Sequence, residues 1–131
     1  MTIAGNKGRE GGGIDPSSTA GPTIIRNVLF NKNTPSNCDG VLGLQGANVE
    51  SGNTCGLSET ESNIKKMGLA GLKDNGGATK THALKAGSPA IDFGNDDNCP
   101  PTDQRGQARV DVPGVGPRIC DTGAFEFVPA P

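Results

Sequence analysis

Four aspartates in the last third of the chain form its densest group of acidic side chains: Asp92, Asp96, Asp97 and Asp103. Hard cations such as calcium bind several carboxylate and carbonyl oxygens that one flexible loop supplies. Asp96, Asp97 and Asp103 are therefore candidate calcium ligands, although their spacing is not that of an EF-hand loop. The alternative is a solvated loop rich in turns, in which Asp and Asn are common without any bound metal.

Arg105 follows this group in the motif T-D-Q-R-G, residues 102–106. Its planar guanidinium group is suited to a bidentate pair with a carboxylate. We expect a pair with Asp92 or Asp121, because each of these aspartates adjoins a short apolar run and the pair would tie the two runs together. The alternative is that Arg105 contacts an acidic polysaccharide.

His82, Ser88 and a neighbouring aspartate have the side-chain types of a nucleophilic triad. Ser88 lies between Gly87 and Pro89, however, and lacks the G-x-S-x-G turn that exposes a nucleophilic serine. No phosphate-binding glycine motif occurs either. We therefore assign no catalytic residue.

The four cysteines, Cys38, Cys55, Cys99 and Cys120, include no C-x-x-C pair, and the chain has one histidine. A zinc site is therefore disfavoured, and two disulfides are expected. Disulfides imply an oxidising, extracellular or cell-surface location. Four cysteines allow three pairings. We favour Cys38–Cys55 and Cys99–Cys120 because each pair lies within one recognisable segment, and a crossed pairing that links the segments is the alternative.

The composition of the 131-residue chain limits its fold and its partners. With 21 glycines, four Phe and no Trp or Tyr, short strands and tight turns are favoured over long helices. The net charge of -2 gives no basic face for nucleic acid. No apolar stretch approaches the ~20 residues of a transmembrane helix. The opening residues lack the apolar run of a signal peptide, so we expect a segment of a longer exported protein.

A faint repeat of 21 residues runs through the first half of the chain. Residues 2–6, T-I-A-G-N, are followed at this interval by T-I-I-R-N and then by L-Q-G-A-N. A fixed period of this length is typical of a solenoid whose stacked coils share one core. Asn6, Asn27 and Asn48 fall at the same position of the repeat, so we expect them to stack as a hydrogen-bonded ladder.

The second half of the chain resembles the C-terminal region of bacterial surface and secreted proteins that are built as right-handed parallel β-helices. The closing domain of that group is called choice-of-anchor Q. Residues 11–14 and 30–33 are also similar to the G-G-x-I and F-x-x-N elements of polymorphic outer-membrane proteins. The segments that carry the main resemblance are residues 74–79, 81–84, 87–92, 94, 99, 102–106 and 120–126.

The resemblance implies an all-β fold in one domain. Residues 1–57 would form a short right-handed parallel β-helix of about three coils. Residues 58–131 would form a connecting loop and a disulfide-stapled C-terminal cap that covers the open end of the solenoid. It also implies structural roles for His82, Asp92, Arg105 and Asp121.

The function implied by the resemblance is that of a non-enzymatic structural or adhesive module in an exported bacterial surface protein, with the upstream β-helix coils as its partner. One alternative is a polysaccharide-binding adhesin or the remnant of a β-helical polysaccharide lyase, with calcium as its cofactor. Against sugar binding, the chain lacks the Trp and Tyr on which sugars stack. Another alternative is a subunit that assembles into filaments through the edges of the β-helix.

Overall fold

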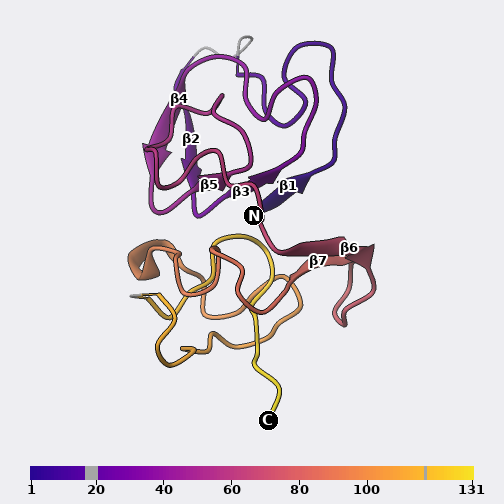
Figure 1. Ribbon diagram of the computed structural model, residues 1–131, viewed down its shortest axis with the longest axis vertical. Coiled ribbons are helices and arrows are strands. Elements are labelled where there is room, and N and C mark those ends of the chain that lie inside the picture. Colours follow the sequence, from indigo (N-terminus) through magenta and orange to yellow (C-terminus); the bar gives the residue numbers. More distant parts are fainter. Residues whose placement is uncertain (17–20, 117) are drawn as a thin grey trace.

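The computed structural model describes residues 1–16, 21–116 and 118–131, and in these ranges the chain is all-β. Short strands and long loops form two halves, residues 1–57 and 58–131. In Figure 1 the first half lies above together with the start of the connecting segment, and the chain from the hairpin at residue 69 onward lies below. The described ranges contain no α-helix, and one 3₁₀ turn, η1 (Asp96–Asn98), lies in the second half. The scarcity of long elements agrees with the composition, which is rich in turn-forming glycine.

Parallel strands build the first half. β1 (Thr2–Ala4), β3 (Leu29–Asn31) and β5 (Val49–Glu50) form one sheet, and β2 (Thr23–Arg26) and β4 (Leu42–Gln45) form another. Parallel neighbours need a crossover that returns the chain to the same end of the sheet. The chain therefore passes through three successive layers: β1, then β2 with β3, then β4 with β5. The sheets are small, and the described strands do not close into a solenoid.

The layers do not repeat at a constant interval, so the predicted 21-residue period is wrong. Asn6 lies opposite Asn33, 27 residues later, and its backbone amide and Nδ2 donate to Asn33 Oδ1 at 3.0 and 3.1 Å. The next interval is shorter, since the amide of Val28 donates to Asn48 Oδ1, 20 residues away, at 2.9 Å. The first interval is longer because the crossover includes the glycine-rich loop that begins at residue 8.

The expected ladder of Asn6, Asn27 and Asn48 is therefore not formed. Asn6 has a different register, and Asn27 and Asn48 bind the backbone of a neighbouring layer instead of one another. Asn27 Oδ1 accepts the amide of Ala47 at 3.0 Å, while Asn48 Oδ1 accepts the amide of Val28 at 2.9 Å. The two asparagines still join adjacent layers, but through side-chain-to-backbone bonds.

The sheet β1–β3–β5 lies between two hydrophobic cores. Successive side chains of a strand point to opposite faces, and Leu29 and Phe30 of β3 are both fully buried. Phe30 packs within the first half, in the cluster that contains Ile25 and Val28. Leu29 belongs to the other cluster, with Val49 and with residues of the second half. One face of the sheet thus forms the interior of the first half, and the other forms the interface with the second half.

In the second half an antiparallel hairpin follows the connecting segment. β6 (Leu69–Lys73) pairs with β7 (Thr81–Leu84), and the described residues that follow are loops apart from η1. Leu84, Ala90 and Ile91 are buried against Leu29 in the core that the halves share. The second half therefore contributes side chains to that core without adding a strand to the parallel sheet.

Three consecutive residues near the C-terminus, which we call the strap (residues 122–124), donate one hydrogen bond to each layer of the first half. In Figure 1 the yellow segment that contains the strap arches toward β1, β3 and β5. The donor–acceptor distances are 3.0 to 3.1 Å, and the residue pairs are Thr122–Ala47, Gly123–Asn27 and Ala124–Thr2. The strap therefore crosses all three layers in the direction in which they stack.

The second half consequently lies beside the stacked layers, whereas the sequence led us to expect it over their end. The layer that follows β5 is formed by the connecting segment. The amide of Glu50 donates to the carbonyl of Glu61 at 2.8 Å, and the amide of Ile64 donates to the carbonyl of Glu50 at 3.1 Å. Residues 61–64 thus cover the edge of β5, and the rest of the second half packs against the face of the sheet.

We expect Leu29→Ala to lower the free energy of unfolding by about 2–5 kcal/mol, because Leu29 fills the core that the two halves share. Urea denaturation followed by circular dichroism measures this change. Val41→Ala, at a side chain that is 91% exposed, is the control and should change stability by less than about 0.5 kcal/mol. Equal effects of the two substitutions would contradict the interface assigned to Leu29.

Candidate functional site

The T-D-Q-R-G motif forms a closed loop around the buried carboxylate of Asp103. Asp103 Oδ1 accepts the amides of Arg105 at 2.7 Å and Gln107 at 3.0 Å, and Oδ2 accepts Arg105 Nε and the amide of Glu126, both at 2.8 Å. Burial alone would raise the pKa of Asp103, but these donors, with the amide of Glu126 foremost, outweigh it and lower the pKa below its ordinary value. The carboxylate is therefore fully used in holding the loop.

Arg105 pairs with Asp103, so the expected pair with Asp92 or Asp121 is wrong. The tight loop turns the carboxylate of Asp103 back onto the guanidinium group two residues later, at 2.7 Å. Arg105 still reaches the second apolar run. Its guanidinium carbon lies 3.6 Å from the ring centre of Phe125, and Nη2 donates to the carbonyl of Glu126 at 2.7 Å. These contacts give Arg105 a structural role through stacking and backbone binding.

Asp121 and Asp92 are two further buried aspartates of this network. Asp121 Oδ1 accepts the amide of Asp92 at 2.8 Å, and Oδ2 accepts the amide of Phe127 at 2.5 Å. Burial raises the pKa of Asp121 to about 7 despite these two bonds, and the nearby carboxylates of Glu126 and Asp92 add to the increase. A neutral, protonated carboxyl group is therefore favoured at Asp121 in mildly acidic solution.

Asp92 has one engaged and one unengaged carboxylate oxygen. Oδ2 accepts the amide of Val112 at 3.0 Å, whereas the buried Oδ1 has no hydrogen-bond partner among the described residues. Burial raises the pKa of Asp92, and the bond from Val112 only partly offsets the increase. Asp111, Glu126 and other carboxylates nearby raise it further. The raised pKa favours the neutral form of Asp92, which costs less to bury with Oδ1 unpartnered than the charged form does.

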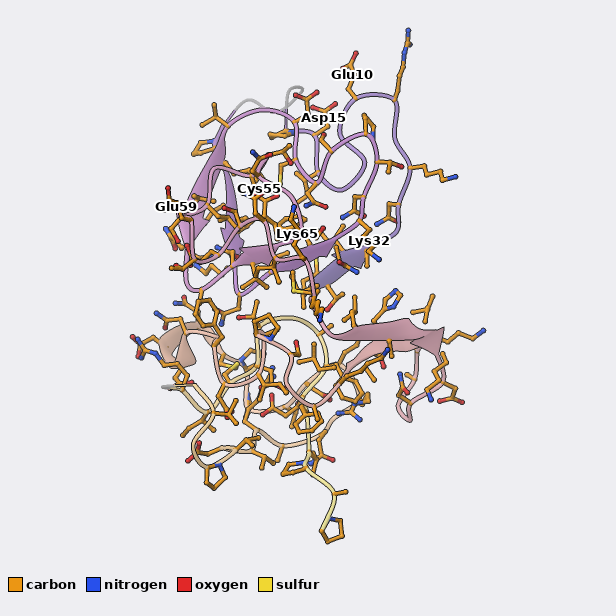
Figure 2. The ribbon with its side chains drawn as sticks, viewed as in Figure 1. Glu10, Asp15, Lys32, Cys55, Glu59 and Lys65 are labelled. Carbon is orange, nitrogen blue, oxygen red and sulfur yellow. A yellow bond between two sulfur atoms is a disulfide. The ribbon has the colours of Figure 1, made fainter. Side chains whose placement is uncertain are left out.

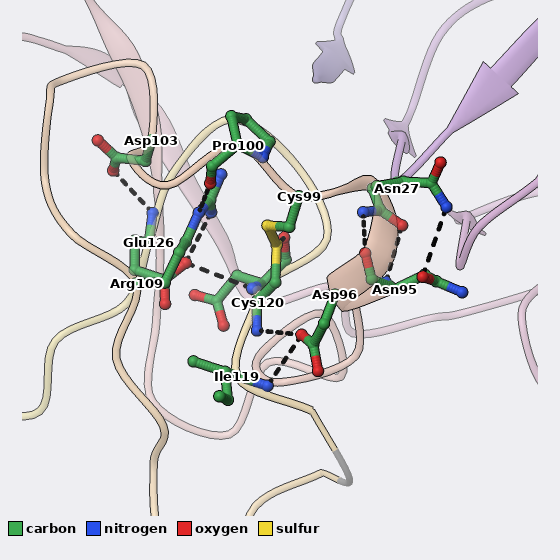
Figure 3. Close-up of a disulfide and its surroundings, with 12 residues drawn as sticks. Asn27, Asn95, Asp96, Cys99, Pro100, Asp103, Arg109, Ile119, Cys120 and Glu126 are labelled. Carbon is green, nitrogen blue, oxygen red and sulfur yellow. Dashed lines mark hydrogen bonds and ion pairs between the residues drawn. A yellow bond between two sulfur atoms is a disulfide. The ribbon is translucent and has the colours of Figure 1, made fainter.

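Glu126 and Arg109 form a buried ion pair that the sequence analysis missed. Arg109 Nη1 lies 2.7 Å from Glu126 Oε2 (Figure 3). The amide of Val110 donates to Oε1 at 2.8 Å. Glu126 is fully buried. It lies in the run G-A-F-E, where we assigned no role to the glutamate. The available signal was the charged residue that ends an apolar run.

Glu50 is the corresponding buried carboxylate of the first half, and it was also missed. Oε2 accepts Asn37 Nδ2 at 3.0 Å and the amide of Thr54 at 3.2 Å, while Oε1 accepts the amide of Cys55 at 3.0 Å. Because Glu50 adjoins Val49 in a strand of two residues, no alternating pattern marks it as buried.

The expected calcium site at Asp96, Asp97 and Asp103 is not formed. Across the described ranges, no group of three or more His, Cys, Asp or Glu residues could hold a metal ion. Asp103 is engaged by Arg105, and Asp96 Oδ1 accepts the amides of Ile119 at 3.2 Å and Cys120 at 3.1 Å (Figure 3). Asp97 lies in η1 and is exposed. The carboxylates of Asp96 and Asp103 are thus used to shape their own loops, and Asp97 lies apart from both interactions.

Both favoured disulfides are present, Cys38–Cys55 in the first half and Cys99–Cys120 in the second. No crossed pairing occurs, so the halves are not joined by a disulfide. The two halves do meet beside the second bond, where the side chain of Asn27 binds the backbone of Asn95. Asn27 Oδ1 accepts the amide of Asn95 and Nδ2 donates to its carbonyl, each at 2.9 Å (Figure 3).

The side chains of the possible triad bind the backbone. His82 Nδ1 lies 2.8 Å from the carbonyl of Ala70, which belongs to the partner strand of the hairpin. The hydroxyl of Ser88 is buried, donates to the carbonyl of Met67 at 2.7 Å and accepts the amide of Ala90 at 3.3 Å. Neither group bonds the other in the described structure.

No family model, curated protein or solved structure matches the chain. The resemblance to choice-of-anchor Q domains thus stays a prediction. Among the described residues, no helix has the length and apolar character required to cross a membrane.

We expect Arg105→Ala to lower the free energy of unfolding by about 3 kcal/mol, because the change leaves the buried carboxylate of Asp103 without its cation. Chemical denaturation at neutral pH measures the loss. Arg9→Ala, at an exposed arginine of the first half, is the matched control. An unchanged denaturation midpoint for Arg105→Ala would contradict the structural role.

We expect Asp121 to make the protein less stable as pH rises from about 4 to about 7. The pKa of Asp121 is higher in the folded than in the unfolded chain, so its favourable contribution is complete at low pH and is lost as pH rises through 7. The difference in unfolding free energy between wild type and Asp121→Asn should thus shift by on the order of 2 kcal/mol across this range.

The comparison with Asp121→Asn isolates this contribution from every other titrating group. Asp97→Asn, at an exposed aspartate, is the control and should run parallel to wild type. Denaturant midpoints at several pH values provide the measurement. A difference between wild type and Asp121→Asn that stays constant from pH 4 to pH 8 would show that Asp121 is not the group responsible.

Proposed function

We propose that the chain is a non-enzymatic structural module of an exported bacterial surface protein. In this proposal residues 1–57 are the last coils of a right-handed parallel β-helix, and residues 58–131 hold these coils together. The observation that carries the proposal is the strap, in which three consecutive residues bind three successive layers. A side lobe that binds every layer opposes the sliding or separation of the coils.

The parallel pairing of the first half supports the β-helix in this proposal. Each layer returns to the same sheet in the same direction, as stacked coils do. One edge of β1 pairs with β3, and no described strand pairs with the other edge. Upstream coils of the parent protein, the partner that we propose, would add their strands at that free edge of β1.

The use of the polar side chains supports a structural role. Buried carboxylates accept backbone amides, as Glu50, Asp103 and Glu126 each do. His82 and Ser88 also bind backbone carbonyls. Groups held in this way stabilise loops that lack strand partners. Two disulfides add stability where no cellular reductant is present, which fits the extracellular or cell-surface location in the proposal.

We expect Thr122→Val to weaken all three layers together, because Thr122 is fully buried and its hydroxyl anchors the strap to the third layer. Loss of the bond leaves the carbonyl of Ala47 without its donor and should cost about 1–3 kcal/mol. Amide hydrogen exchange should become faster in β1, β3 and β5. Thr60→Val, at an exposed threonine, is the control.

Faster exchange confined to β4 and β5 would mean that the strap does not join the layers. The non-enzymatic part of the proposal is tested separately by incubation with polygalacturonate, in which a lyase releases unsaturated, ultraviolet-absorbing products. We expect no such product. Product formation that Arg105→Ala abolishes would replace the structural proposal by that of a lyase.

A further inference from the structure

A basic pocket lies where the two halves meet. It has a volume of about 170 Å³, and four of its lining residues are Lys32, Lys65, Lys66 and Lys85. Lys32 follows β3 directly, Lys65 and Lys66 belong to the connection that leads to β6, and Lys85 follows β7. In Figure 2 the labels of Lys32 and Lys65 stand in the lower part of the first half, toward the second half. Three separate segments thus contribute positive charge to one concave site.

The concentration of charge in this pocket is not explained by the rest of the structure. The chain has seven lysines, and four of them line this site, whereas no Asp or Glu does. The ion pairs of the described residues involve Arg105 and Arg109 and none of these lysines. Like charges in one concavity repel one another, and the repulsion is relieved when an anion binds between them.

Lys32 also has a backbone conformation that is unfavourable for lysine. Its φ is +54°, in the left-handed region where glycine and asparagine are favoured. The amide of Lys32 donates to Ser51 Oγ at 2.8 Å, which holds this conformation. A glycine would adopt this φ with less strain, so the presence of lysine at position 32 costs some stability.

We propose that this pocket binds the sulfate or carboxylate groups of an acidic polysaccharide. Lysine ammonium groups on flexible stems act as adaptable point charges. They suit a polymer whose anionic groups recur at variable positions. The rigid, planar guanidinium group of arginine would be less suitable for such a ligand. The pocket has a volume of about 170 Å³ and is open to solvent. It therefore has room for a single anionic group, with the remainder of the glycan outside.

Nucleic acid fits the same chemistry less well. Stacking of bases on aromatic side chains supplies much of the binding of single strands. The chain has no Trp or Tyr, Phe30 is fully buried, and the other three Phe pack against the shared core. The pocket thus offers charge without a stacking platform.

Glycan binding goes beyond the proposed structural role and does not depend on it. Lys32 belongs to the first half and Lys85 to the second, so a bound anion would link the halves through their side chains. A ligand that binds only the folded state raises its stability. Heparin should therefore raise the melting temperature of the wild-type protein, whereas neutral dextran should not.

The test compares two double variants with the same change in net charge. Lys32→Gln/Lys85→Gln removes one pocket lysine from each half. The control, Lys73→Gln/Lys80→Gln, removes two exposed lysines of the β6–β7 hairpin that do not line the pocket. Calorimetric titration with heparin at about 0.05 and 0.15 M salt should show affinity that falls as salt screens the lysines. The pocket variant should bind at least about tenfold more weakly than the control.

Several outcomes would overturn the proposal. Absence of heparin and polygalacturonate binding would refute it, and equal weakening in the two double variants would reduce it to diffuse attraction. Tighter binding of single-stranded DNA than of heparin would replace the glycan by a nucleic acid. None of these outcomes bears on the strap, which hydrogen exchange tests separately.

Lys32→Gly separates binding from folding. Glycine adopts a positive φ without strain, so this variant should fold with a melting temperature equal to or above that of wild type. It should nevertheless bind heparin more weakly. A Lys32→Gly protein with unchanged heparin affinity would exclude Lys32 from the site.

Discussion

Buried backbone amides in loops need acceptors, and in this protein carboxylate side chains supply many of them. Strands and turns cannot satisfy these amides, because the strands are short and most of the second half is loop. Glu50 supplies acceptors inside the first half, whereas Asp103, Asp121 and Glu126 supply them inside the second. Each carboxylate binds amides from residues distant in the sequence or around a tight turn. The network takes the place of regular secondary structure, since an unpaired buried amide is costly.

The small number of large apolar residues explains how the two halves are joined. A chain with four Phe and no Trp or Tyr cannot fill two large independent cores. One strand, β3, contributes to both cores: Leu29 packs in the core that the halves share, and Phe30 packs in the core of the first half. Hydrogen bonds from the strap and from Asn27 then fix the relative position of the halves. The packing thus acts on the face of the sheet, and the hydrogen bonds act on Thr2 of β1 and on residues just before β3 and β5.

The sequence predicted the all-β class, which the resemblance implied and the glycine-rich composition favoured. It also favoured the two observed cysteine pairs, because each pair lies within one segment, although a crossed pairing stayed open. It predicted a structural Arg105 but assigned the wrong partner, since no sequence rule shows that a tight loop folds Asp103 back onto it. The predicted 21-residue period was wrong because it rested on a single short sequence match per repeat. Such matches do not reveal that the first crossover is longer than the second. One feature of the sequence did indicate that the second half lies against the face of the sheet, although we did not interpret it in this way. Adjacent apolar residues such as Leu29 and Phe30 are typical of a parallel sheet that is covered on both faces. The burial of Glu50 gave no signal in the sequence, and that of Glu126 was indicated only by its position at the end of an apolar run. Both are buried because the tertiary structure brings backbone amides to their carboxylates.

The arrangement of the disulfides has a consequence for their formation in a chain that is exported, as we propose for this one. Both cysteines of the first disulfide, Cys38 and Cys55, precede Cys99 in the sequence, so the two disulfide loops do not overlap. A polypeptide that crosses a membrane from its N-terminus can therefore oxidise its first pair while the second pair is still on the other side. Sequential oxidation of this kind yields the native connectivity without reshuffling, so the topology suits a chain that matures during translocation.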